Sequence, residues 1–268
     1  MKIILCGHTG SENRGCEAIV RSVCSILRST CKNAVIYLAT FDKKADVAAG
    51  LDSVVDEFIE YGKIKRFSPG FFWYGLWHKL FHNDQMAQWV VQRKLWRKID
   101  GNTMLLKIGG DIYCYDRPVI PYALNRVAKK RGAKNILFGC SVEKSRIDTE
   151  MAQDLRQYQM IFARESITFQ TIADAGVPAD RLRLYPDPAF SLKYELFPVE
   201  DLRENNTIGM NISPLILDSG REKTMVMKNY ERLTEYILNE TRWNILLIPH
   251  VYANGNKQDL APLTALYQ

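Results

Sequence analysis

The sequence predicts an α/β fold built on a Rossmann-like, doubly wound parallel sheet. Short apolar runs alternate with turns and helical patterns through the first 195 residues, which is typical of βα units on a parallel sheet. The same alternation restarts after residue 206, so a second domain is expected. Composition agrees with a globular chain, since 47% of the 268 residues are hydrophobic and 25% are charged.

The first domain, residues 1–195, is expected to carry most of the strands. Strands buried on both faces are continuous apolar runs, whereas amphipathic helices carry apolar residues at intervals of three and four. In chain order these patterns predict strands over 2–6, 34–40, 53–61, 103–109, 134–140, 159–164 and 181–186. Between them they predict helices over 15–29, 121–131, 149–157 and 166–175, the last with Ser166 as its N-cap.

The second domain, residues 207–268, is expected to be incomplete. Pro198 and a pair of asparagines mark a polar linker over 196–206. The remaining patterns predict strands over 207–214 and 243–252, with a helix over 223–241 between them. Each half of a Rossmann-like domain needs about three strands. This part therefore either packs on the first domain or belongs to a longer protein, and we favour the second interpretation.

Net charge and cysteine content bear on the class of protein. The 36 Lys and Arg exceed the 30 Asp and Glu by six, which suits anionic substrates or an anionic membrane surface but is too small to predict binding to nucleic acid. The six cysteines form no C-x-x-C pair, so we expect no metal site and no disulfide scaffold. No stretch resembles a signal peptide or the roughly 20 apolar residues of a membrane span, so a cytoplasmic protein is expected.

One segment, residues 63–98, interrupts the alternation of strands and helices. It contains four of the five tryptophans, and Asp84 is its single acidic residue. Trp89 and Trp96 lie at helical spacing among several lysines and arginines, which predicts a basic amphipathic helix. Three interpretations are open: packing of the aromatic side on the sheet, a lining for a sugar acceptor, or peripheral contact with anionic lipid.

The loop after the first strand, GHTGSENRGCEA, is a candidate binding loop. Its glycines Gly7, Gly10 and Gly15 do not have the spacing of the dinucleotide fingerprint. Cys16 and Glu17 stand where a P-loop requires Lys and Ser or Thr, and a carboxylate at this helix start would repel a phosphate. The loop therefore predicts close backbone approach to a hydroxyl-bearing ligand or to a neighbouring loop.

Five short motifs, in order along the whole chain, resemble the polysaccharide pyruvyl transferase family. Asn13, Gly15, Glu17 and Ala18, after Gly7, resemble its N-x-G-x-E-A opening. KIGGDIYCYD (107–116), FARESIT (162–168) and YPDPAFSL (185–192) resemble its glycine-pair turn, its arginine motif and its Asp-Pro-Ala-Phe segment, and IGMNISP and ILLIPHVY resemble the first two strands of its second domain.

The resemblance implies a fold, a reaction and its substrates. The fold would be two Rossmann-like domains, similar to type B glycosyltransferases. The reaction would transfer an enolpyruvyl unit from phosphoenolpyruvate, the donor substrate, to two hydroxyls of a sugar or lipid-linked glycan, forming a ketal without a cofactor. Two features depart from the family: Cys16 replaces an acidic residue, and the later arginine-x-histidine motif, which would supply a catalytic acid and an anchor for phosphoenolpyruvate, is absent. The resemblance thus implies that this chain holds part of an active site.

The implied chemistry needs cations for a carboxylate and a phosphate, an acid for the enol methylene and a base for the hydroxyl. Arg164 is the expected anion clamp, because it ends an apolar run at the carboxyl edge of the sheet. An ion pair with Glu165 or Asp187 is the alternative for this arginine. Asp187, between two prolines, is itself interpreted as a structural residue.

Other residues are placed at the substrate site. Gly109, Gly110 and Asp111 end another strand, where Asp111 would accept a sugar hydroxyl; a plain turn is the alternative. His250 also ends a strand and is the candidate acid or orienting group, with His8 a comparable candidate and ordinary hydrogen bonding the alternative for both. Completing the set of expected substrate-binding residues are Gly7, Asn13, Gly15 and Glu17.

Two other functional hypotheses remain open beside pyruvyl transfer. One is a glycosyltransferase of the same architecture that uses a nucleotide sugar. The other is an inert relative or fragment that binds glycan without catalysis. Stabilisation by phosphoenolpyruvate or by a nucleoside diphosphate discriminates between the two enzymes.

Overall fold

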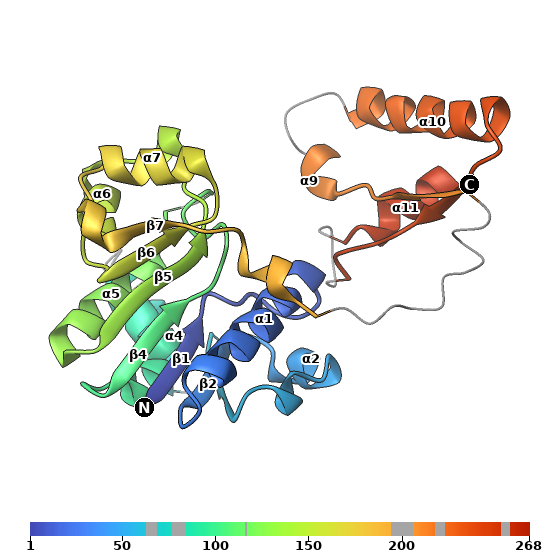
Figure 1. The fold of residues 1–268 in the computed structure, drawn as a ribbon. Helices are drawn as coiled ribbons and strands as arrows, with labels where there is room; N and C mark the ends of the chain where they lie inside the picture. The colour runs from blue at the N-terminus through green and yellow to red at the C-terminus, as the bar shows by residue number, and fades with distance from the viewer. Residues whose placement is uncertain (63–68, 77–83, 116, 194–205, 218–222, 253–257) are drawn as a thin grey trace. The chain divides into compact units, whose positions relative to one another are not determined.

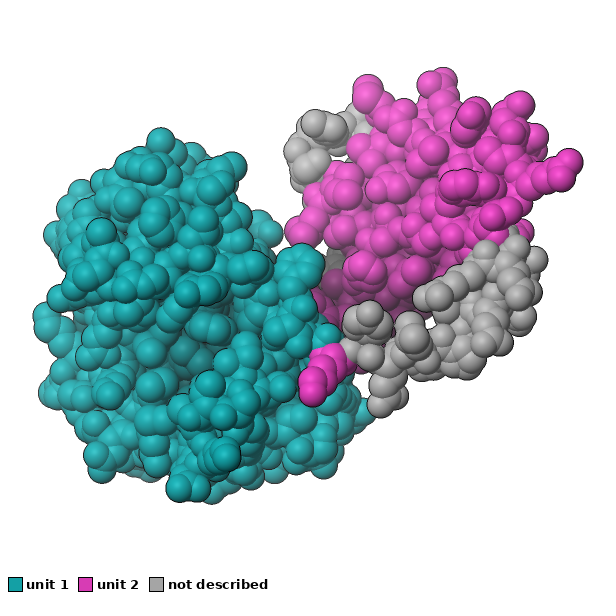
Figure 2. Space-filling view, in the orientation of Figure 1, with its two compact units in different colours: residues 1–11, 16–192 teal, residues 12–15, 193–268 magenta. Residues whose placement is uncertain are grey.

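The structure, a computed structural model, describes residues 1–62, 69–76, 84–115, 117–193, 206–217, 223–252 and 258–268 (Figure 1). The chain forms two compact units, shown in separate colours in Figure 2. Unit 1 comprises residues 1–11 and 16–192, and unit 2 comprises residues 12–15 and 193–268.

Unit 1 is an α/β unit around a parallel sheet (Figure 1). Its strands are β1 (Lys2–Cys6), β2 (Val35–Thr40), β3 (Glu57–Glu60), β4 (Thr103–Lys107), β5 (Lys134–Cys140), β6 (Met160–Ala163) and β7 (Leu182–Leu184). Over the described residues the sheet has seven strands in the order β3-β2-β1-β4-β5-β6-β7, and every neighbouring pair is parallel. The fold class predicted from the sequence is therefore confirmed.

The described helices of unit 1 cover the sheet. They are α1 (Arg14–Thr30), α2 (Lys43–Ala48), α3 (Pro69–Gly75), α4 (Asp84–Lys98), α5 (Val119–Arg131), α6 (Thr149–Leu155) and α7 (Ser166–Asp174). Alternate residues of β1 belong to different core clusters: Ile3 and Leu5 pack with α1, whereas Ile4 and Cys6 pack with α4 and α5. Because both faces of β1 are buried, its sequence is a continuous apolar run.

Several local details differ from the sequence-based expectations. The strand expected over 53–61 is β3, which begins at Glu57 because Leu51–Ser53 forms a short 3-10 turn. The six-residue helix α2 has no counterpart among the predicted helices, although Asp42 caps it by accepting hydrogen bonds from the backbone N–H of Lys44 and Ala45. Ser166 was predicted to cap α7, and this is wrong. Glu165 is the N-cap, and its carboxylate accepts a hydrogen bond from the backbone N–H of Thr168 at 3.0 Å.

The second half of α4 carries part of the aromatic, basic segment. Leu95 is fully buried, and Trp96 packs against the same core cluster while its indole N–H donates to Gln92 Oε1 at 3.2 Å. Arg97 and Lys98 are exposed on the other side. Trp96 therefore packs on the core of unit 1, as the first of the three interpretations of this segment expected. The Trp89 side chain and residues 63–68 and 77–83 lie outside the described residues, so lipid contact stays a prediction.

Unit 2 contains a two-stranded parallel sheet. Its elements are β8 (Thr207–Met210), α9 (Pro214–Leu217), α10 (Lys223–Glu240), β9 (Asn244–Leu247) and α11 (Leu260–Tyr267). Residues 12–15 join this unit through an antiparallel bridge between Asn13 and Val251. The backbone N–H of Tyr252 donates to the Glu12 carbonyl at 2.8 Å, next to that bridge. In neither unit does any described helix have the length and apolar character needed to span a membrane.

A buried polar network closes the end of β4 in unit 1. The Lys107 ammonium contacts Asn125 Oδ1 and donates to the Tyr158 hydroxyl at 2.9 Å. Tyr113 donates to Asp154 Oδ2 at 2.6 Å, and its hydroxyl lies 2.7 Å from that of Tyr158. Burial lowers the pKa of Lys107 to about 8, although the Asp154 charge opposes this shift. The network thus keeps a lysine inside the core, two residues before the glycine pair.

We predict that Lys107 makes the stability of unit 1 depend on pH in the alkaline range. An unfolded lysine has a pKa of roughly 10.4, so the unfolded chain binds more protons than the folded one between that value and about 8. Relative to Lys107→Met, the wild type should gain on the order of 2 kcal/mol of unfolding free energy between pH 7.5 and pH 9.5. Urea unfolding of both proteins at each pH measures this difference, and an unchanged difference contradicts it.

Candidate functional site

The candidate site lies at the carboxyl ends of the strands of unit 1. Strands β2 and β3 lie on one side of β1, whereas β4 to β7 lie in order on its other side, so the strand order reverses between β1 and β4. In open α/β sheets, ligands bind outside the carboxyl ends of the strands where the strand order reverses. The loops after β1 and β4 therefore define the centre of the site, and those after β5, β6 and β7 extend it.

Gly7 and Gly109 bring the loops after β1 and β4 into backbone contact. Gly7 has φ = +87°, which favours glycine. A Cβ on Gly109 would lie 2.6 Å from the Gly7 carbonyl oxygen, and a Cβ on Gly7 would lie 3.0 Å from the Gly109 nitrogen. Two uses were expected for the glycine-rich loop, and Gly7 has the second: it lets this loop approach a neighbouring one, the loop after β4.

Gly110 lies under the guanidinium of Arg164. A Cβ on Gly110 would overlap Arg164 Nη1. The Arg164 Nε donates to Ser141 Oγ at 2.7 Å, and its Nη1 donates to Asp187 Oδ2 at 2.9 Å. The side chain stays 28% exposed, so the cation is fixed in orientation and still open to a ligand. Of the two ion-pair partners considered for Arg164, the structure selects Asp187.

Asp111 and Arg164 act electrostatically on the same neighbouring groups. Burial raises the pKa of the Cys114 thiol, and the Asp111 charge adds to the shift while Arg164 opposes it. Burial likewise raises the pKa of Tyr115, whose hydroxyl hydrogen-bonds Asp111. Cys16 at the start of α1 also feels the Asp111 charge, after the larger effects of burial and of the hydrogen bond with Thr9. Asp111 is therefore near groups from two loops, with the hydrogen-bonding capacity that a sugar hydroxyl needs.

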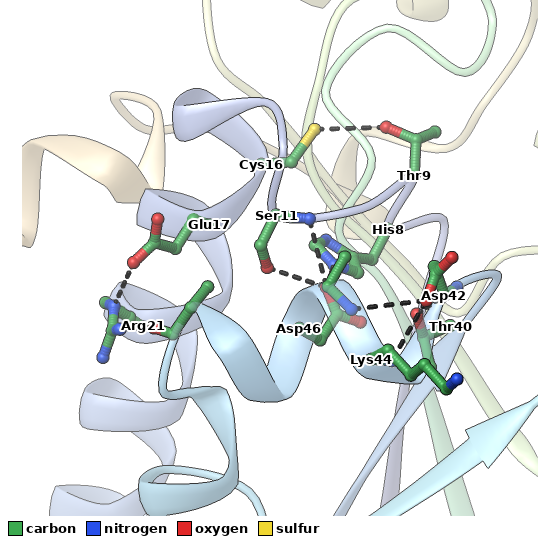
Figure 3. A network of polar contacts seen from close by, with 12 residues as sticks. His8, Thr9, Ser11, Cys16, Glu17, Arg21, Thr40, Asp42, Lys44 and Asp46 are labelled. Carbon is green, nitrogen blue, oxygen red and sulfur yellow. Dashed lines mark hydrogen bonds and ion pairs between the residues drawn. The ribbon is translucent and has the colours of Figure 1, made fainter. Parts of the chain in front are cut away.

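His8 anchors the first loop from inside (Figure 3). Asp46 Oδ1 lies 2.9 Å from His8 Nε2 and accepts from the Ser11 backbone N–H at 3.1 Å and the Ser11 hydroxyl at 2.7 Å. Both side chains of the His8–Asp46 pair are fully buried. Burial by itself raises the pKa of Asp46, but hydrogen bonds from His8, Thr40 and Ser11, together with the electrostatic effect of His8, outweigh burial and leave that pKa below its usual value. His8 thus takes the hydrogen-bonded alternative.

The remaining expected site residues divide between the units. Asn13 Oδ1 accepts from the Gly15 backbone N–H at 2.9 Å at the start of α1, and both residues cluster with unit 2. Glu17, in unit 1, pairs with Arg21 at 2.8 Å (Figure 3). His250, in unit 2, has an exposed ring, and its backbone N–H donates to Asp259 Oδ2 at 2.9 Å.

Several residues that shape this region carry no local sequence signal for their role. Asp46 contacts His8 across 38 positions of sequence, and Ser141 contacts Arg164 across 23, so no local pattern marks either contact. Tyr185 and Phe190 border a hollow beside Arg164, and both lie in the YPDPAFSL motif. That motif was the available signal for these two residues. Among the described residues, no three His, Cys, Asp or Glu side chains gather in a metal-binding arrangement.

Comparison with known proteins identifies the family. The sequence model of the polysaccharide pyruvyl transferase family matches residues 13–264. The chain belongs to this family. Residues 107–116, 162–168 and 185–192, whose motifs suggested it, supply Gly109, Asp111, Arg164 and Asp187 to the strand-end site. No curated protein sequence matches the chain.

Solved structures show that this pyruvyl transferase family member shares its fold with sugar-nucleotide enzymes. A UDP-N-acetylglucosamine 2-epimerase superposes with a TM-score of 0.56 at 12% identity, covering 91% of this chain and 62% of the epimerase. A putative UDP-N-acetylglucosamine 2-epimerase from Listeria monocytogenes gives 0.55 at 10% identity, covering 99% and 66%. S. aureus MnaA with UDP gives 0.55 at 10% identity, covering 100% and 65%. The chain therefore spans about two thirds or less of the length of these proteins.

The two neighbouring glycines are predicted to respond differently to the same substitution. Gly109→Ala should cost about 3 kcal/mol of unfolding free energy, because the new methyl group meets the Ile112 side chain and also the backbone carbonyl of Gly7, which cannot move aside as a side chain can. Gly110→Ala should cost less, about 1–2 kcal/mol, because the new methyl group meets a side chain instead of backbone and displaces the Arg164 guanidinium from its part-exposed contacts with Ser141 and Asp187. Urea unfolding of both variants tests this order, and equal costs contradict the backbone contact.

Asp46 and Asp42 provide a second matched pair. Asp46→Ala leaves three buried donors from His8 and Ser11 without their acceptor, so we expect a loss of at least about 3 kcal/mol. Asp42→Ala removes only a helix cap and should cost about 1 kcal/mol. The folded pKa of Asp46 is lowered, so its contribution is complete above roughly pH 4 and is lost as the pH falls through the folded value. Unfolding curves at pH 7 and pH 3.5 measure both effects; a gap between wild type and Asp46→Ala that does not narrow at pH 3.5 refutes this assignment.

Proposed function

We propose that this chain transfers an enolpyruvyl unit from phosphoenolpyruvate to two sugar hydroxyls, as a cytoplasmic enzyme of cell-surface glycan synthesis. The observation that carries the proposal is the position of Arg164 at the strand ends, held by Ser141 and Asp187 and partly exposed. A guanidinium has five N–H donors, and these two contacts leave others for the carboxylate or phosphate of the donor. Membership of the polysaccharide pyruvyl transferase family supports the same reaction.

The proposed reaction places one demand on each group. An acid protonates the methylene carbon of phosphoenolpyruvate, which becomes a methyl group as the enol double bond is lost. The first sugar oxygen attacks the neighbouring carbon while a base takes its proton, and phosphate leaves. The second hydroxyl then attacks the same carbon and gives its proton to the phosphate, which closes the ketal. Arg164 would neutralise the anionic donor, as fixed cations do where charge builds up. Asp111 would accept a sugar hydroxyl, and His250 stays the candidate acid.

A nucleotide sugar is the second candidate donor. S. aureus MnaA, which shares the fold, was solved with UDP, and this makes UDP the informative comparison ligand. The glycine-rich loop favours the first proposal, since Glu17 stands at the start of α1, where a phosphate would otherwise bind. The two donors therefore make opposite predictions for the same experiment.

Thermal denaturation with phosphoenolpyruvate or UDP tests the proposal. A ligand that binds only the folded state raises the midpoint and adds about 2.7 kcal/mol at 100 times its Kd. We expect phosphoenolpyruvate to do this, and Arg164→Lys to weaken its binding by about 2 kcal/mol through loss of charge-assisted hydrogen bonds. Gly110→Ala should weaken binding too, because it displaces the Arg164 guanidinium without removing its charge.

Arg183→Lys is the matched control for Arg164→Lys. Arg183 is an exposed arginine on β7 that donates to the Ala179 and Leu182 carbonyls, so its variant should keep the full shift with phosphoenolpyruvate. A shift with UDP alone would support the nucleotide-sugar enzyme instead. With no shift from either ligand, both enzymes are refuted for this chain and the glycan-binding hypothesis leads.

A further inference from the structure

A hollow on unit 1 lies beside the proposed anion clamp. It has a volume of about 600 Å³, within the range of small-molecule sites of roughly 300–1,000 Å³. Among its lining residues are Arg164, Leu184, Tyr185, Pro186, Asp187 and Phe190. These residues follow or end β6 and β7, so the hollow opens at the same edge of the sheet as the glycine pair.

The rim of the hollow exposes aromatic and aliphatic side chains to solvent. Phe190 is 87% exposed, Tyr185 is 59% exposed and Leu184 is 48% exposed. A single exposed apolar side chain needs no explanation. Three around one concave surface, next to a fixed cation, are typical of a ligand site with an apolar wall and few polar groups.

The exposed Phe190 is carried by a rigid turn. Asp187 Oδ1 accepts from the Ala189 backbone N–H at 2.9 Å, and Ser191 Oγ donates to the Pro188 carbonyl at 2.8 Å. Pro188 packs into the space left by Gly139, where a Cβ would lie 2.6 Å from its Cδ atom. The aromatic ring is therefore presented on a fixed backbone, which lowers the entropic cost of binding a ligand there.

One carboxylate fixes both the turn and the cation. Asp187 Oδ1 caps the turn that presents Phe190, while Oδ2 holds Arg164 Nη1 at 2.9 Å. The relation between the aromatic ring and the guanidinium is thus set by a single side chain. Two ligands, one on the ring and one on the guanidinium, would therefore meet in a fixed geometry.

We propose that this hollow is the acceptor subsite, where a pyranose ring of the glycan packs on Phe190. The inference rests on the proposed function: a donor held by Arg164 must lie within bonding distance of the acceptor, and the hollow adjoins that residue. The C–H face of a pyranose is apolar and suits the negative face of an aromatic ring. Its edge carries hydroxyls, which can donate to the carboxylates of Asp187 and Glu165.

A nucleobase is the competing occupant, because bases also stack on aromatic rings. The polar groups of the hollow favour the sugar. Asp187 and Glu165 are among the lining residues, and their negative charges would repel the diphosphate of a nucleotide, whereas a neutral sugar meets no such repulsion.

Saturation-transfer NMR on the full chain tests the assignment. The probes are methyl β-D-glucopyranoside, methyl β-D-galactopyranoside and methyl α-D-mannopyranoside, with UDP as the comparison. We expect saturation to reach ring C–H protons of at least one glycoside, and Phe190→Ala to weaken its binding by about tenfold, the effect of losing one aromatic stacking contact. Phe190→Tyr should restore binding.

Ile167→Ala is the matched control. Ile167 is 72% exposed on α7, and it is not among the residues that line the hollow. This variant should keep the glycoside signal, and both it and Phe190→Ala should keep the midpoint shift with phosphoenolpyruvate. Circular dichroism confirms that each variant is folded.

Each outcome decides the assignment. Absence of saturation transfer to all three glycosides, or an unchanged signal in Phe190→Ala, overturns it. Saturation of uridine protons that depends on Phe190 also overturns it and assigns the hollow to a nucleotide. If glycoside binding depends on Phe190 but phosphoenolpyruvate does not shift the midpoint, the sugar subsite is supported and only the proposed pyruvyl transfer is refuted.

Discussion

The backbone contact between Gly7 and Gly109 is the constraint on which the strand-end site depends. It joins the loops after β1 and β4 where the strand order reverses, and a side chain on either residue would push these loops apart. Gly110 follows at once and leaves the space that the Arg164 guanidinium occupies. Beneath the contact, the buried network around Lys107 ties the end of β4 to α5 and α6. A glycine pair thus locates the cation, and a buried lysine holds the strand that carries the pair.

The electrostatics of the site follow from how Arg164 is held. An exposed arginine in solution samples many rotamers, and ordering it for an anion costs conformational entropy. Here the carboxylate of Asp187 and the hydroxyl of Ser141 already fix the side chain. The negative charge of Asp187 also balances part of the positive charge of Arg164. Such a cation attracts an anionic ligand less strongly at long range than a free arginine would, but it is already oriented to bind that ligand on contact. This arrangement suits a site in which an anionic donor must meet a neutral acceptor in one orientation.

The sequence predicts the sheet well because strands buried on both faces leave continuous apolar runs, as in β1 and β5. It misses α2, since a six-residue helix has too few turns to show periodicity. It places the cap of α7 one residue late, because serine is the commoner cap and the carboxylate of Glu165 is equally able to accept. The His8–Asp46 pair and the Ser141–Arg164 contact join distant segments, so only the assembled sheet reveals them. The motifs locate Arg164 and Phe190 in the chain, but the two contacts by which Asp187 positions both of them are visible only in the folded structure.

The two roles of Asp187 also constrain how this site can diverge. In most binding sites, the residues that contact one substrate can drift while those contacting the other stay fixed, so specificity for each partner evolves separately. Here Oδ1 sets the turn that carries Phe190 and Oδ2 sets Arg164. A change at Asp187 alters both at once, so under the proposed function new acceptor preferences would arise at Tyr185, Leu184 or Phe190 itself. Because this carboxylate positions both groups, a substitution at Asp187 alone cannot change the preference for one substrate without affecting the other.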